Sequence, residues 1–400
     1  MCRRRRQAAH LCASSSPGHS FPLVPLALAL RDAGHEVTFA TGPDVRDGVA
    51  AVGLDVVVAG GSVGAAFGRA LARHRFTERP RDEKTAIMLA NEVFGRDLPC
   101  AVAADLLDLV GDSRPDLVVA ETGNPGAALV AAHTGIPCVT HSFGRRPPSH
   151  IALSGRVTSA LLEVADEIGV TPLAPGAPLG HTYLDICPPS MQAPPAGDEA
   201  RELPLRPTGW NPPMPDFTAR SGRRRWVYLT LGTAMGDPAV LRAAVGGLTR
   251  LDLDVLVAGG SVDVGELAAV AGSRADRVLV EPFVPQADLL AGRVGDHPPA
   301  LVVHHGGSGT TLAAAAAGIP QVFLPQGADQ FVNADAVTAL GVGRALVGAD
   351  GRDPAALVTA AEELLADAAS RAAARALAAE IAGMPSPSDV AARVQEWAVP

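Results

Sequence analysis

Two segments in different halves of the chain follow the same pattern, and this repeat constrains the fold more than any other feature. PDLVVAETGNPGAALVAAHTGIPCVTHSFG spans 115–144, and PALVVHHGGSGTTLAAAAAGIPQVFLPQG spans 299–327. Each copy predicts a strand, a turn of small residues, an apolar helix ended by Gly-Ile-Pro, and a second strand. Such units build parallel sheets with right-handed crossovers. Two copies favour two similar α/β domains, and chance similarity between alanine-rich segments stays as the alternative.

The same alternation of helix and strand continues outside the repeat. Residues 21–41 predict an apolar helix, a stop at Gly34 and a strand, and Ala8–Ala13 supplies a first strand that is interrupted by His10. The apolar stretches are continuous rather than alternating, which is typical of a sheet covered on both faces. Further strands are expected at 53–61, where the strand should be buried, and at 225–233 and 254–260, with a helix at 239–251.

The length and the proline distribution predict the domain organisation. A chain of 400 residues fits about two domains of ~150 residues each. The proline-dense stretch 186–217 looks like a linker rather than part of a helix or a central strand. We therefore expect a first domain over 1–205, a linker over 206–224, a second domain over 225–385, and a terminal helix over 386–400 with Trp397 as its large anchor.

Composition limits the partners and the compartment. The net charge of −9 argues against a nucleic-acid binder, whose footprint is usually basic. No apolar run reaches the ~18–20 residues that a membrane span requires, and the arginine run Arg3–Arg6 is expected to be a solvated tail. The cysteines are scattered without CxxC spacing, which predicts free thiols in a reducing cytoplasm. They are Cys2, Cys12, Cys100, Cys138 and Cys187.

The junction HHGGSGTT within the second copy predicts a phosphate cradle. Glycines let a backbone approach a ligand closely, and the helix that follows points free N–H groups and its positive dipole end at the strand tips. His304 at the end of the strand can donate an N–H to a phosphate oxygen. The loop residues that we expect to contribute are Gly306, Gly307, Ser308, Gly309, Thr310 and Thr311.

Other interpretations of this junction fit less well. A Walker loop needs a lysine that this loop lacks, and the dinucleotide fingerprint GxGxxG fails at Leu312. Adjacent histidines on a strand point to opposite faces, so one metal site rarely uses both. A purely structural glycine turn with buried histidines remains the alternative.

Three segments together resemble the bacterial natural-product glycosyltransferases, which use nucleotide-activated deoxysugars to decorate antibiotic aglycones. They are SPGHSFPLVPLALALRDAGHEVTFAT (16–41), FVPQADLL (283–290) and LVVHHGGSGTTLAAAAAGIPQVFLPQGADQFVNADAV (301–337). The enediyne and polyketide branch is the most similar, and the resemblance runs from Ser16 through nearly the whole chain. It implies the GT-B fold, in which two Rossmann-like domains face each other across a cleft, in agreement with the repeat.

The resemblance assigns donor-binding roles to the second half. It places His304 on the donor diphosphate, with the backbone of Gly306–Thr310 completing the cradle, and leaves His305 facing the interior. Fixed N–H donors there would stabilise the leaving diphosphate without lysine or metal. Gly232 and Thr233 resemble a second phosphate contact, for which plain helix capping is the alternative.

The resemblance also implies how the sugar and the base are bound. Asp329 and Gln330 match an acid–amide pair that binds sugar hydroxyls, and an ordinary solvated pair is the alternative. Val284 and Gln286 belong to the segment 283–286, whose backbone resembles the part that meets the nucleotide base. Family analogy favours thymidine as the nucleoside.

On the acceptor side, the resemblance points to His19 and Glu121. An imidazole at the tip of the first strand can take a proton from an acceptor hydroxyl near neutral pH, and Glu121 matches the acid that orients this base. The family often has Asp at that position. A turn-capping His19 and a solvated Glu121 are the alternatives.

The implied reaction is an inverting transfer of a deoxyhexose from a dTDP-linked sugar to a hydroxyl of a polyketide- or enediyne-type product. We expect no metal and no cofactor besides this co-substrate, and interpret Asp252-Leu253-Asp254 as a solvated connector rather than a DxD metal motif. The expected partners are the aglycone and the nucleotide sugar, with a homodimer left open, and residues 145–185 should line the acceptor pocket. A sugar-nucleotide 2-epimerase and a non-catalytic donor-binding partner are the alternative functions.

Overall fold

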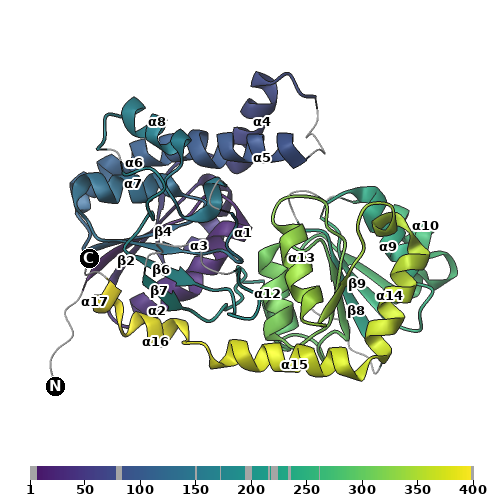
Figure 1. The fold of residues 1–400 in the computed structure, drawn as a ribbon. Helices are drawn as coiled ribbons and strands as arrows, with labels where there is room; N and C mark the ends of the chain where they lie inside the picture. The colour runs from purple at the N-terminus through teal and green to yellow at the C-terminus, as the bar shows by residue number, and fades with distance from the viewer. Residues whose placement is uncertain are drawn as a thin grey trace. The chain divides into compact units, whose positions relative to one another are not determined.

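A computed structural model describes residues 7–77, 83–148, 151–171, 173–193, 201–214, 217, 224–232, 236–260 and 262–397. The chain divides into two compact units (Figure 1). The first unit contains Met1–Pro188, Gln192–Pro213 and Met384–Pro400, and the second contains Pro189–Met191 and Met214–Gly383. Each unit holds one sheet in which all paired strands are parallel.

The sheet of the first unit has the order β3-β2-β1-β4-β5-β6-β7. The interrupted first strand forms after all and lies in the middle of the sheet, paired with β2 and β4. His10 is tolerated there because its buried ring places Nε2 3.2 Å from the Ser113 hydroxyl. The strands are β1 (Ala8–Cys12), β2 (Glu36–Thr41), β3 (Asp55–Val58), β4 (Leu117–Glu121), β5 (Cys138–His141), β6 (Thr182–Asp185) and β7 (Arg201–Pro204).

The strand within 53–61 is not buried as predicted. β3 is the edge strand of the sheet and pairs only with β2, so its side chains lack a neighbour on one side. Val58 is 44% exposed as a result. The continuous apolar run DVVV therefore indicated a strand correctly but not its position in the sheet.

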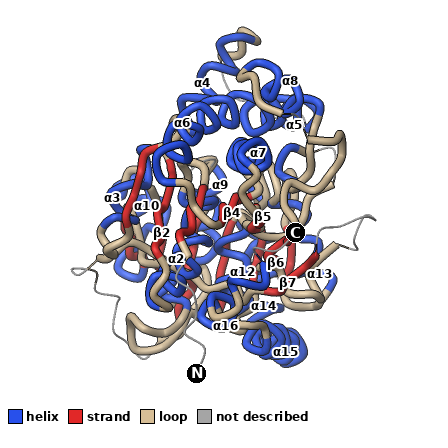
Figure 2. The backbone as a smooth tube through the Cα atoms, turned by 90° about the vertical axis from the view of Figure 1, so that its left-hand side faces the viewer, coloured by secondary structure: helices blue, strands red, loops and turns tan. Residues whose placement is uncertain are grey.

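Helices cover both faces of the first sheet. Helices α6 and α7 pack on one face against a buried cluster that includes Cys12, Val118 and Cys138, and α2 and α16 lie on the other (Figures 1 and 2). The helices are α1 (Pro17–Ser20), η1 (Phe21–Leu23), α2 (Val24–Asp32), α3 (Pro43–Ala50), α4 (Val63–Arg73), α5 (Glu83–Glu92), the π-helical turn η2 (Val93–Asp97), α6 (Leu98–Ser113), α7 (Pro125–Thr134), η3 (Ala152–Ser154), α8 (Ser159–Glu167), α16 (Pro387–Ala391) and α17 (Val394–Trp397).

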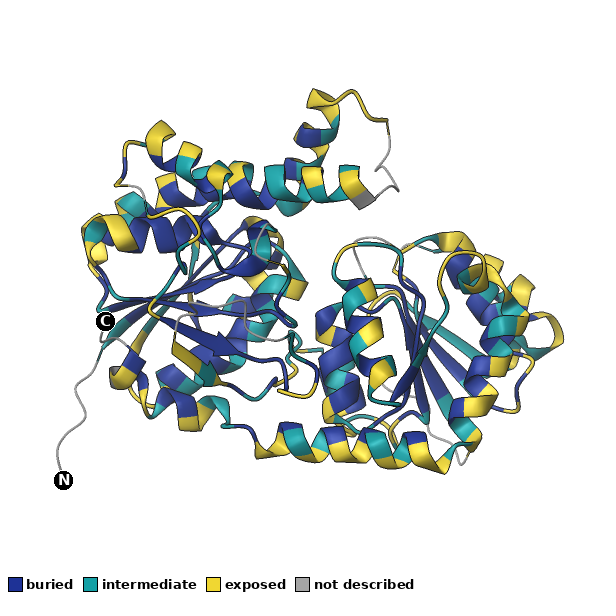
Figure 3. Ribbon diagram, viewed as in Figure 1, coloured by how far each residue is buried: buried dark blue, intermediate teal, exposed yellow. Residues whose placement is uncertain are grey.

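The sheet of the second unit has the order β10-β9-β8-β11-β12-β13, and its buried strands are dark blue in Figure 3. Successive side chains alternate between two helical layers, with Val303 toward α9 and α14 and Val302 toward α11 and α12. The strands are β8 (Trp226–Thr230), β9 (Asp254–Ala258), β10 (Val278–Glu281), β11 (Leu301–His304), β12 (Gln321–Phe323) and β13 (Gly343–Ala345). The helices are α9 (Pro238–Leu248), α10 (Val264–Ala271), η4 (Gly272–Arg277), α11 (Gln286–Leu290), α12 (Ser308–Ala316), α13 (Gln330–Ala339), η5 (Asp350–Arg352), α14 (Pro354–Ala366) and α15 (Ala368–Gly383).

The predicted repeat is present in both sheets. It forms β4–α7–β5 in the first unit and β11–α12–β12 in the second, and each pair of strands is adjacent and parallel. Each helix ends just before its Gly-Ile-Pro, as the glycine predicts. Each copy of the repeat therefore places a loop of small residues at the carboxyl edge of its own sheet.

The end of the chain differs from the single terminal helix expected over 386–400. Two short helices, α16 and α17, form there instead, and they belong to the first unit. A reciprocal capping box between Ser386 and Asp389 starts α16, and Trp397 is buried. Within 186–217, residues 201–204 form the edge strand β7, where Pro204 removes no central ladder hydrogen bond.

The described cysteines Cys12, Cys100, Cys138 and Cys187 are free, as expected. Cys2 and Arg3–Arg6 lie outside the described residues. Among the helices that the structure describes, none is both long and apolar enough to cross a bilayer.

Candidate active site

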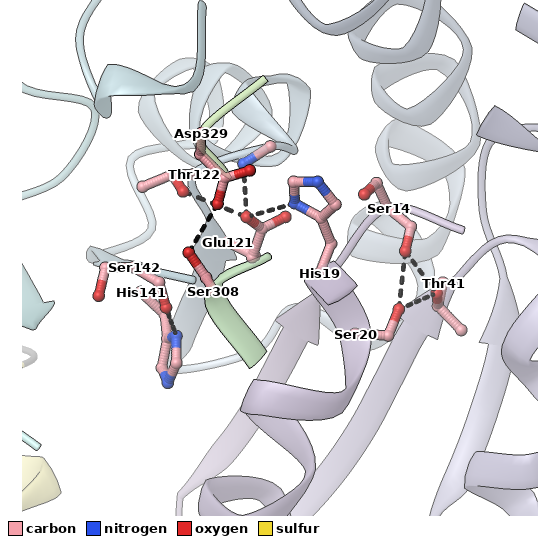
Figure 4. Close-up of polar contacts among 11 residues, drawn as sticks. Ser14, His19, Ser20, Thr41, Glu121, Thr122, His141, Ser142, Ser308 and Asp329 are labelled. Carbon is pink, nitrogen blue, oxygen red and sulfur yellow. Dashed lines mark hydrogen bonds and ion pairs between the residues drawn. The ribbon is translucent and has the colours of Figure 1, made fainter. Parts of the chain in front are cut away.

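The carboxyl edge of the first sheet brings His19 and Glu121 together. His19 lies on α1, directly after β1, and Glu121 is the last residue of the neighbouring strand β4. The imidazole Nδ1 is 2.9 Å from Glu121 Oε1 (Figure 4). The Glu121 side chain is fully buried, and that of His19 is 12% exposed.

The hydrogen bonds around Glu121 define the tautomer of His19. Oε1 also accepts the backbone N–H of Gly123 at 2.7 Å and the hydroxyl of Thr122 at 3.1 Å. A carboxylate that collects these donors acts as an acceptor, so Nδ1 of His19 carries the hydrogen of their shared bond. The lone pair of the neutral imidazole is then on Nε2, which is the tautomer a general base needs.

Gly123 fixes how closely the loop after β4 approaches this pair. A Cβ at this position would lie 2.6 Å from His19 Nδ1 and 2.9 Å from Glu121 Oε2. No larger residue fits without moving one of the two side chains. Gly123 was not among the residues predicted from the sequence, although the small-residue turn after strand 117–121 marks its place.

His141 lies beside Glu121 on the adjacent strand, because the two residues are register partners in β4 and β5. Its Nδ1 donates to the Ser142 carbonyl at 2.5 Å, as Figure 4 shows. Burial lowers the pKa of His141 to about 4, so the ring is neutral near pH 7. Its Nε2 and Glu121 Oε2 are both buried and have no hydrogen-bond partner among the described residues.

In the second unit, the glycine loop leads from β11 directly into α12. Gly307 is the N-cap of α12 in extended conformation, so the first N–H groups of the helix are available at the loop. Gly306 has φ +96°, and a Cβ there would lie 2.8 Å from the Gln330 carbonyl oxygen. Around Gly309 no atom lies within 4 Å of an added Cβ. The protein alone therefore does not require glycine at 309.

His304 is buried beneath this loop, and its contact with the donor diphosphate stays a prediction. Its imidazole is fully buried against Phe323, with Nε2 2.9 Å from Gln321 Oε1 and Nδ1 accepting the N–H of Gly306 at 3.1 Å. Burial lowers its pKa to about 3, and the neighbouring His305 contributes to this shift. The strand alternation of β11 places His304 on the same side as Val302, under the helices.

His305 packs against two glycine turns and is itself largely buried. Its Nε2 lies 2.5 Å from where a Cβ on Gly307 would be, and its Cε1 lies 2.8 Å from one on Gly232. The ring is thus held between the turns that follow β8 and β11. Burial lowers the pKa of His305, while Asp329 and the backbone of Thr230 oppose this shift. Thr233, the other residue predicted at the first turn, lies outside the described residues.

Asp329 is hydrogen-bonded to the glycine loop, and Gln330 is hydrogen-bonded to the segment that precedes it. Asp329 Oδ2 accepts from the Ser308 hydroxyl at 2.7 Å (Figure 4) and from the Asn333 amide at 2.9 Å. Gln330 is buried, and its Oε1 accepts the N–H groups of Gln326 and Gly327 instead. The side-chain oxygen of Gln330 therefore holds the loop before α13, and the sugar-binding role of this residue stays a prediction.

Asn333 was not predicted from the sequence. Its amide donates to the Gly306 carbonyl at 2.9 Å as well as to Asp329 and Ser308. The available signal was its spacing, four residues after Asp329 on the same face of α13.

The segment predicted to meet the base packs against the start of α12. Gln286 Oε1 accepts the Thr310 hydroxyl at 3.0 Å and the Tyr228 hydroxyl at 3.4 Å, and Val284 is buried. The loop after β10 and the glycine loop are thereby connected. Asp252 of the DLD sequence contacts Arg224 and Arg277 at 2.7 and 2.8 Å, so it forms surface ion pairs rather than being only solvated.

Two parallel-sheet α/β units with polar loops at their carboxyl edges define the GT-B class of glycosyltransferases. The structure matches the crystal structure of glycosyltransferase SsfS6 from Streptomyces sp. SF2575, complexed with thymidine diphosphate, with a TM-score of 0.76 and 29% identity over 98% of this chain and 100% of that one. The fold class implied by the repeat and the resemblance is confirmed.

The family follows from the sequence comparisons. Residues 28–232 match the N-terminal domain of the erythromycin biosynthesis protein CIII-like family, and residues 242–397 match its C-terminal domain. The chain is 35% identical to L-demethylnoviosyl transferase of Streptomyces niveus, over 94% of each protein. It is 33% identical to elloramycin glycosyltransferase ElmGT of Streptomyces olivaceus, over 96% of this chain and 95% of the relative. The chain belongs to this family and is a glycosyltransferase of the antibiotic deoxysugar type.

Proposed function

We propose that this glycosyltransferase moves a deoxyhexose from a dTDP-linked sugar, with inversion, to a hydroxyl of a polyketide- or enediyne-type natural product. The observation that carries the proposal is the 2.9 Å contact between His19 Nδ1 and Glu121 Oε1 at the carboxyl edge of the first sheet. The thymidine diphosphate in the SsfS6 complex supports the nucleotide. The names of the noviosyl and elloramycin relatives support a sugar-to-antibiotic transfer.

In this mechanism His19 is the general base. Nε2 takes the proton of the acceptor hydroxyl while that oxygen forms its bond to the anomeric carbon. The bond between this carbon and the diphosphate oxygen breaks in the same displacement, and dTDP leaves with the electron pair. Glu121 keeps the hydrogen on Nδ1 and stabilises the imidazolium that forms. A single displacement of this kind inverts the configuration at the carbon.

The second unit supplies the leaving-group site. The N–H groups at the start of α12 are fixed donors for the diphosphate, and their dipoles need no reorganisation during the reaction. We propose that His305 rather than His304 contacts the diphosphate, because the His305 ring packs against the glycine loop whereas His304 is fully buried beneath it. The open space beside Gly309 gives room for a phosphate oxygen. Asp329 is placed to accept a sugar hydroxyl, and Val284 and Gln286 lie in the segment proposed to contact thymine.

Ligand-dependent stabilisation and turnover test the proposal. A ligand at 100 times its dissociation constant stabilises a protein by about 2.7 kcal/mol, so dTDP should raise the melting temperature more than UDP does. A panel of dTDP-deoxyhexoses with polyphenolic and macrolide acceptors should yield glycoside of inverted anomeric configuration. His19→Ala should abolish transfer while donor binding is kept.

Four outcomes would contradict the proposal. Isomerised sugar nucleotide in the absence of acceptor would identify a 2-epimerase. Donor binding without transfer to any acceptor would favour a non-catalytic partner. Full transfer by His19→Ala would remove His19 from the mechanism. Loss of transfer on addition of a chelating agent, with recovery when a divalent cation is returned, would contradict the proposed metal independence.

A further inference from the structure

We propose that Phe94, held in place by a π-helical turn and by Arg73, positions the imidazole of His19 for proton transfer. The inference rests on the proposed function in one respect, which is the role of His19 as general base. Phe94 lies in the chain far from His19, and no feature of the sequence connects them. The support comes from the ring contacts of His19, the geometry of the turn, the ion pairs of Arg73 and the packing of Phe94.

The imidazole of His19 lies between two aromatic rings. The centroid of the Phe143 ring is 4.7 Å away with an interplanar angle of 44°, and that of Phe94 is 5.3 Å away with an angle of 34°. Gly123 lies close to Nδ1, as described above. The hydrogen bond to Glu121 fixes one atom of the ring, but it does not by itself prevent rotation about the line joining that atom to Oε1. The two phenylalanines restrict that rotation, which would otherwise turn Nε2 away from an acceptor.

A π-helical turn presents Phe94 to His19. The five residues Val93–Asp97 form this turn between α5 and α6, and Val93, Phe94 and Gly95 are all buried in it. π-turns are rare, and where they occur within α-helices they are frequent at functional sites. A continuous α-helix from α5 to α6 would rotate Phe94 relative to at least one of the two flanking helices.

Arg73 of α4 joins the two ends of this turn. Its Nε donates to Glu92 Oε1 at 2.6 Å, and a terminal nitrogen donates to Asp97 Oδ2 at 2.6 Å. Glu92 and Asp97 are five residues apart, and in a regular α-helix residues at this spacing point about 140° away from each other. One guanidinium can therefore reach both carboxylates because the turn is π-helical. His74 adds a contact with Glu92 at 2.7 Å.

Phe94 is also held by apolar packing. It belongs to a buried cluster with Ala66, Ala70, Leu89 and Ala152, and it meets the Phe67 ring edge-on at 6.0 Å. Only 7% of Phe94 is exposed. The ring cannot leave its contact with His19 without disturbing the packing of α4 and α5. Phe94 is thus a positioning residue, which acts on the reaction through His19.

Steady-state kinetics with a graded set of variants test this inference. Phe94→Ala should lower kcat by about 10- to 100-fold, since small misplacements of a reacting group cost this much, and should leave KM for the dTDP-sugar unchanged. Phe94→Tyr keeps the ring and should restore most of the rate, with Phe94→Leu between the two. Leu89→Ala is the matched control, because Leu89 is buried in the same cluster but brings no ring to His19. It should lower stability without a comparable loss of kcat.

A spectroscopic readout separates positioning from general destabilisation. With ¹⁵N-labelled histidine, the His19 signals can be assigned by their loss in His19→Asn. The wild-type protein should show the Nδ1–H tautomer alone, and Phe94→Ala should show a mixture of both tautomers. Arg73→Ala should shift the same signals in the same direction by a smaller amount, because other contacts still hold the turn. Arg69→Ala, one turn earlier on α4, is the control for loss of a basic side chain.

The results that would overturn the inference are distinct from those that would overturn the proposed function. Phe94→Ala could leave both the tautomer and kcat unchanged while His19→Ala still abolishes transfer. This result would show that Phe94 does not position His19, and it would still support His19 as the general base. Equal losses of kcat in Phe94→Ala and Leu89→Ala would show that the Phe94 substitution acts only by destabilising the fold. A mixed tautomer in Phe94→Ala together with full transfer by His19→Ala would support the positioning of the His19 imidazole by Phe94. It would refute the role of His19 as general base.

Discussion

The imidazole of His305 lies directly against Gly307, so that a Cβ on Gly307 would come within 2.5 Å of His305 Nε2. His304, one residue earlier, is turned into the core and bonded to Gln321. Two adjacent histidines therefore have opposite environments. One belongs to the loop proposed to bind diphosphate, and the other belongs to the packing beneath it.

The contact between His305 and Gly307 predicts that Gly307→Ala weakens donor binding. The added methyl group must displace the imidazole or the loop, and either movement disturbs the N–H groups at the start of α12. We expect a fall in dTDP affinity, measured by titration calorimetry, with the chain still folded. Gly111→Ala on α6 is the control, because nothing lies within 4 Å of the added Cβ there. Wild-type affinity in Gly307→Ala would argue against a diphosphate at this loop.

Substitution of the two histidines should separate stability from binding. His304→Ala leaves the buried Gln321 without its partner, which typically costs about 1–3 kcal/mol of unfolding free energy. His305→Ala should reduce dTDP affinity, whereas His304→Ala should leave that affinity close to the wild-type value. Urea denaturation and calorimetry on both variants measure the two quantities. The opposite pattern, with dTDP affinity lost only in His304→Ala, would restore the role that the sequence first indicated for His304.

Glu121→Gln should lower kcat far more than it changes donor binding. The amide can turn its NH₂ group toward His19 Nδ1, which would favour the wrong tautomer and leave the imidazolium unstabilised. General-base catalysis contributes typically about 10²–10⁴-fold, and a loss within this range is expected. Glu163→Gln on α8 is exposed and serves as the control. A variant that retains its full rate over a range of pH would show that Glu121 does not orient the base.

The buried histidines predict a loss of stability in acid. Burial lowers the pKa of His304 to about 3 and that of His141 to about 4, against 6.5 in the unfolded chain. Between these values the unfolded state binds protons that the native state does not. The unfolding free energy should therefore fall as the pH decreases from 6.5 toward about 4, by at most about 1.4 kcal/mol per pH unit for each group.

Urea midpoints measured across this range check the prediction. His141→Phe removes one of the two groups and should make the pH dependence shallower. A midpoint that is constant between neutral pH and about pH 5 would show that these imidazoles are protonated as easily in the native protein as in the unfolded one.

The repeat was sufficient to predict one parallel strand–helix–strand unit in each sheet, because Gly-Ile-Pro ends a helix and restarts a strand through local backbone chemistry. β1 forms despite His10 because the Ser113 hydroxyl, on a helix distant in the sequence, forms a hydrogen bond with Nε2 of its ring. The exposure of β3 was not predictable from its apolar residues, since the position of a strand in the sheet depends on the strands that pair with it. The local sequence pattern thus predicted the presence of strands and helices better than their burial.

For the site, strand alternation predicted that His304 and His305 point to opposite faces, but not which of the two rings packs against the glycine loop. The pairing of His19 with Glu121 came from the family resemblance, and the longer side chain of Glu still reaches the imidazole. Phe94 and Asn333 were missed because their roles depend on a π-turn and on a helix face opposite a loop. Neither relationship has a marker in the local sequence.

The residues Met384–Pro400 belong to the first unit, whereas Met214–Gly383 and the short piece Pro189–Met191 form the second. The main part of the second unit is therefore inserted within the first. A chain truncated near residue 205 would lack α16 and the buried Trp397, so the first unit needs residues from two distant parts of the chain. Exchange of the second unit between relatives is best attempted by replacing Met214–Gly383 as one insert, and not by joining an amino-terminal half to a carboxyl-terminal half.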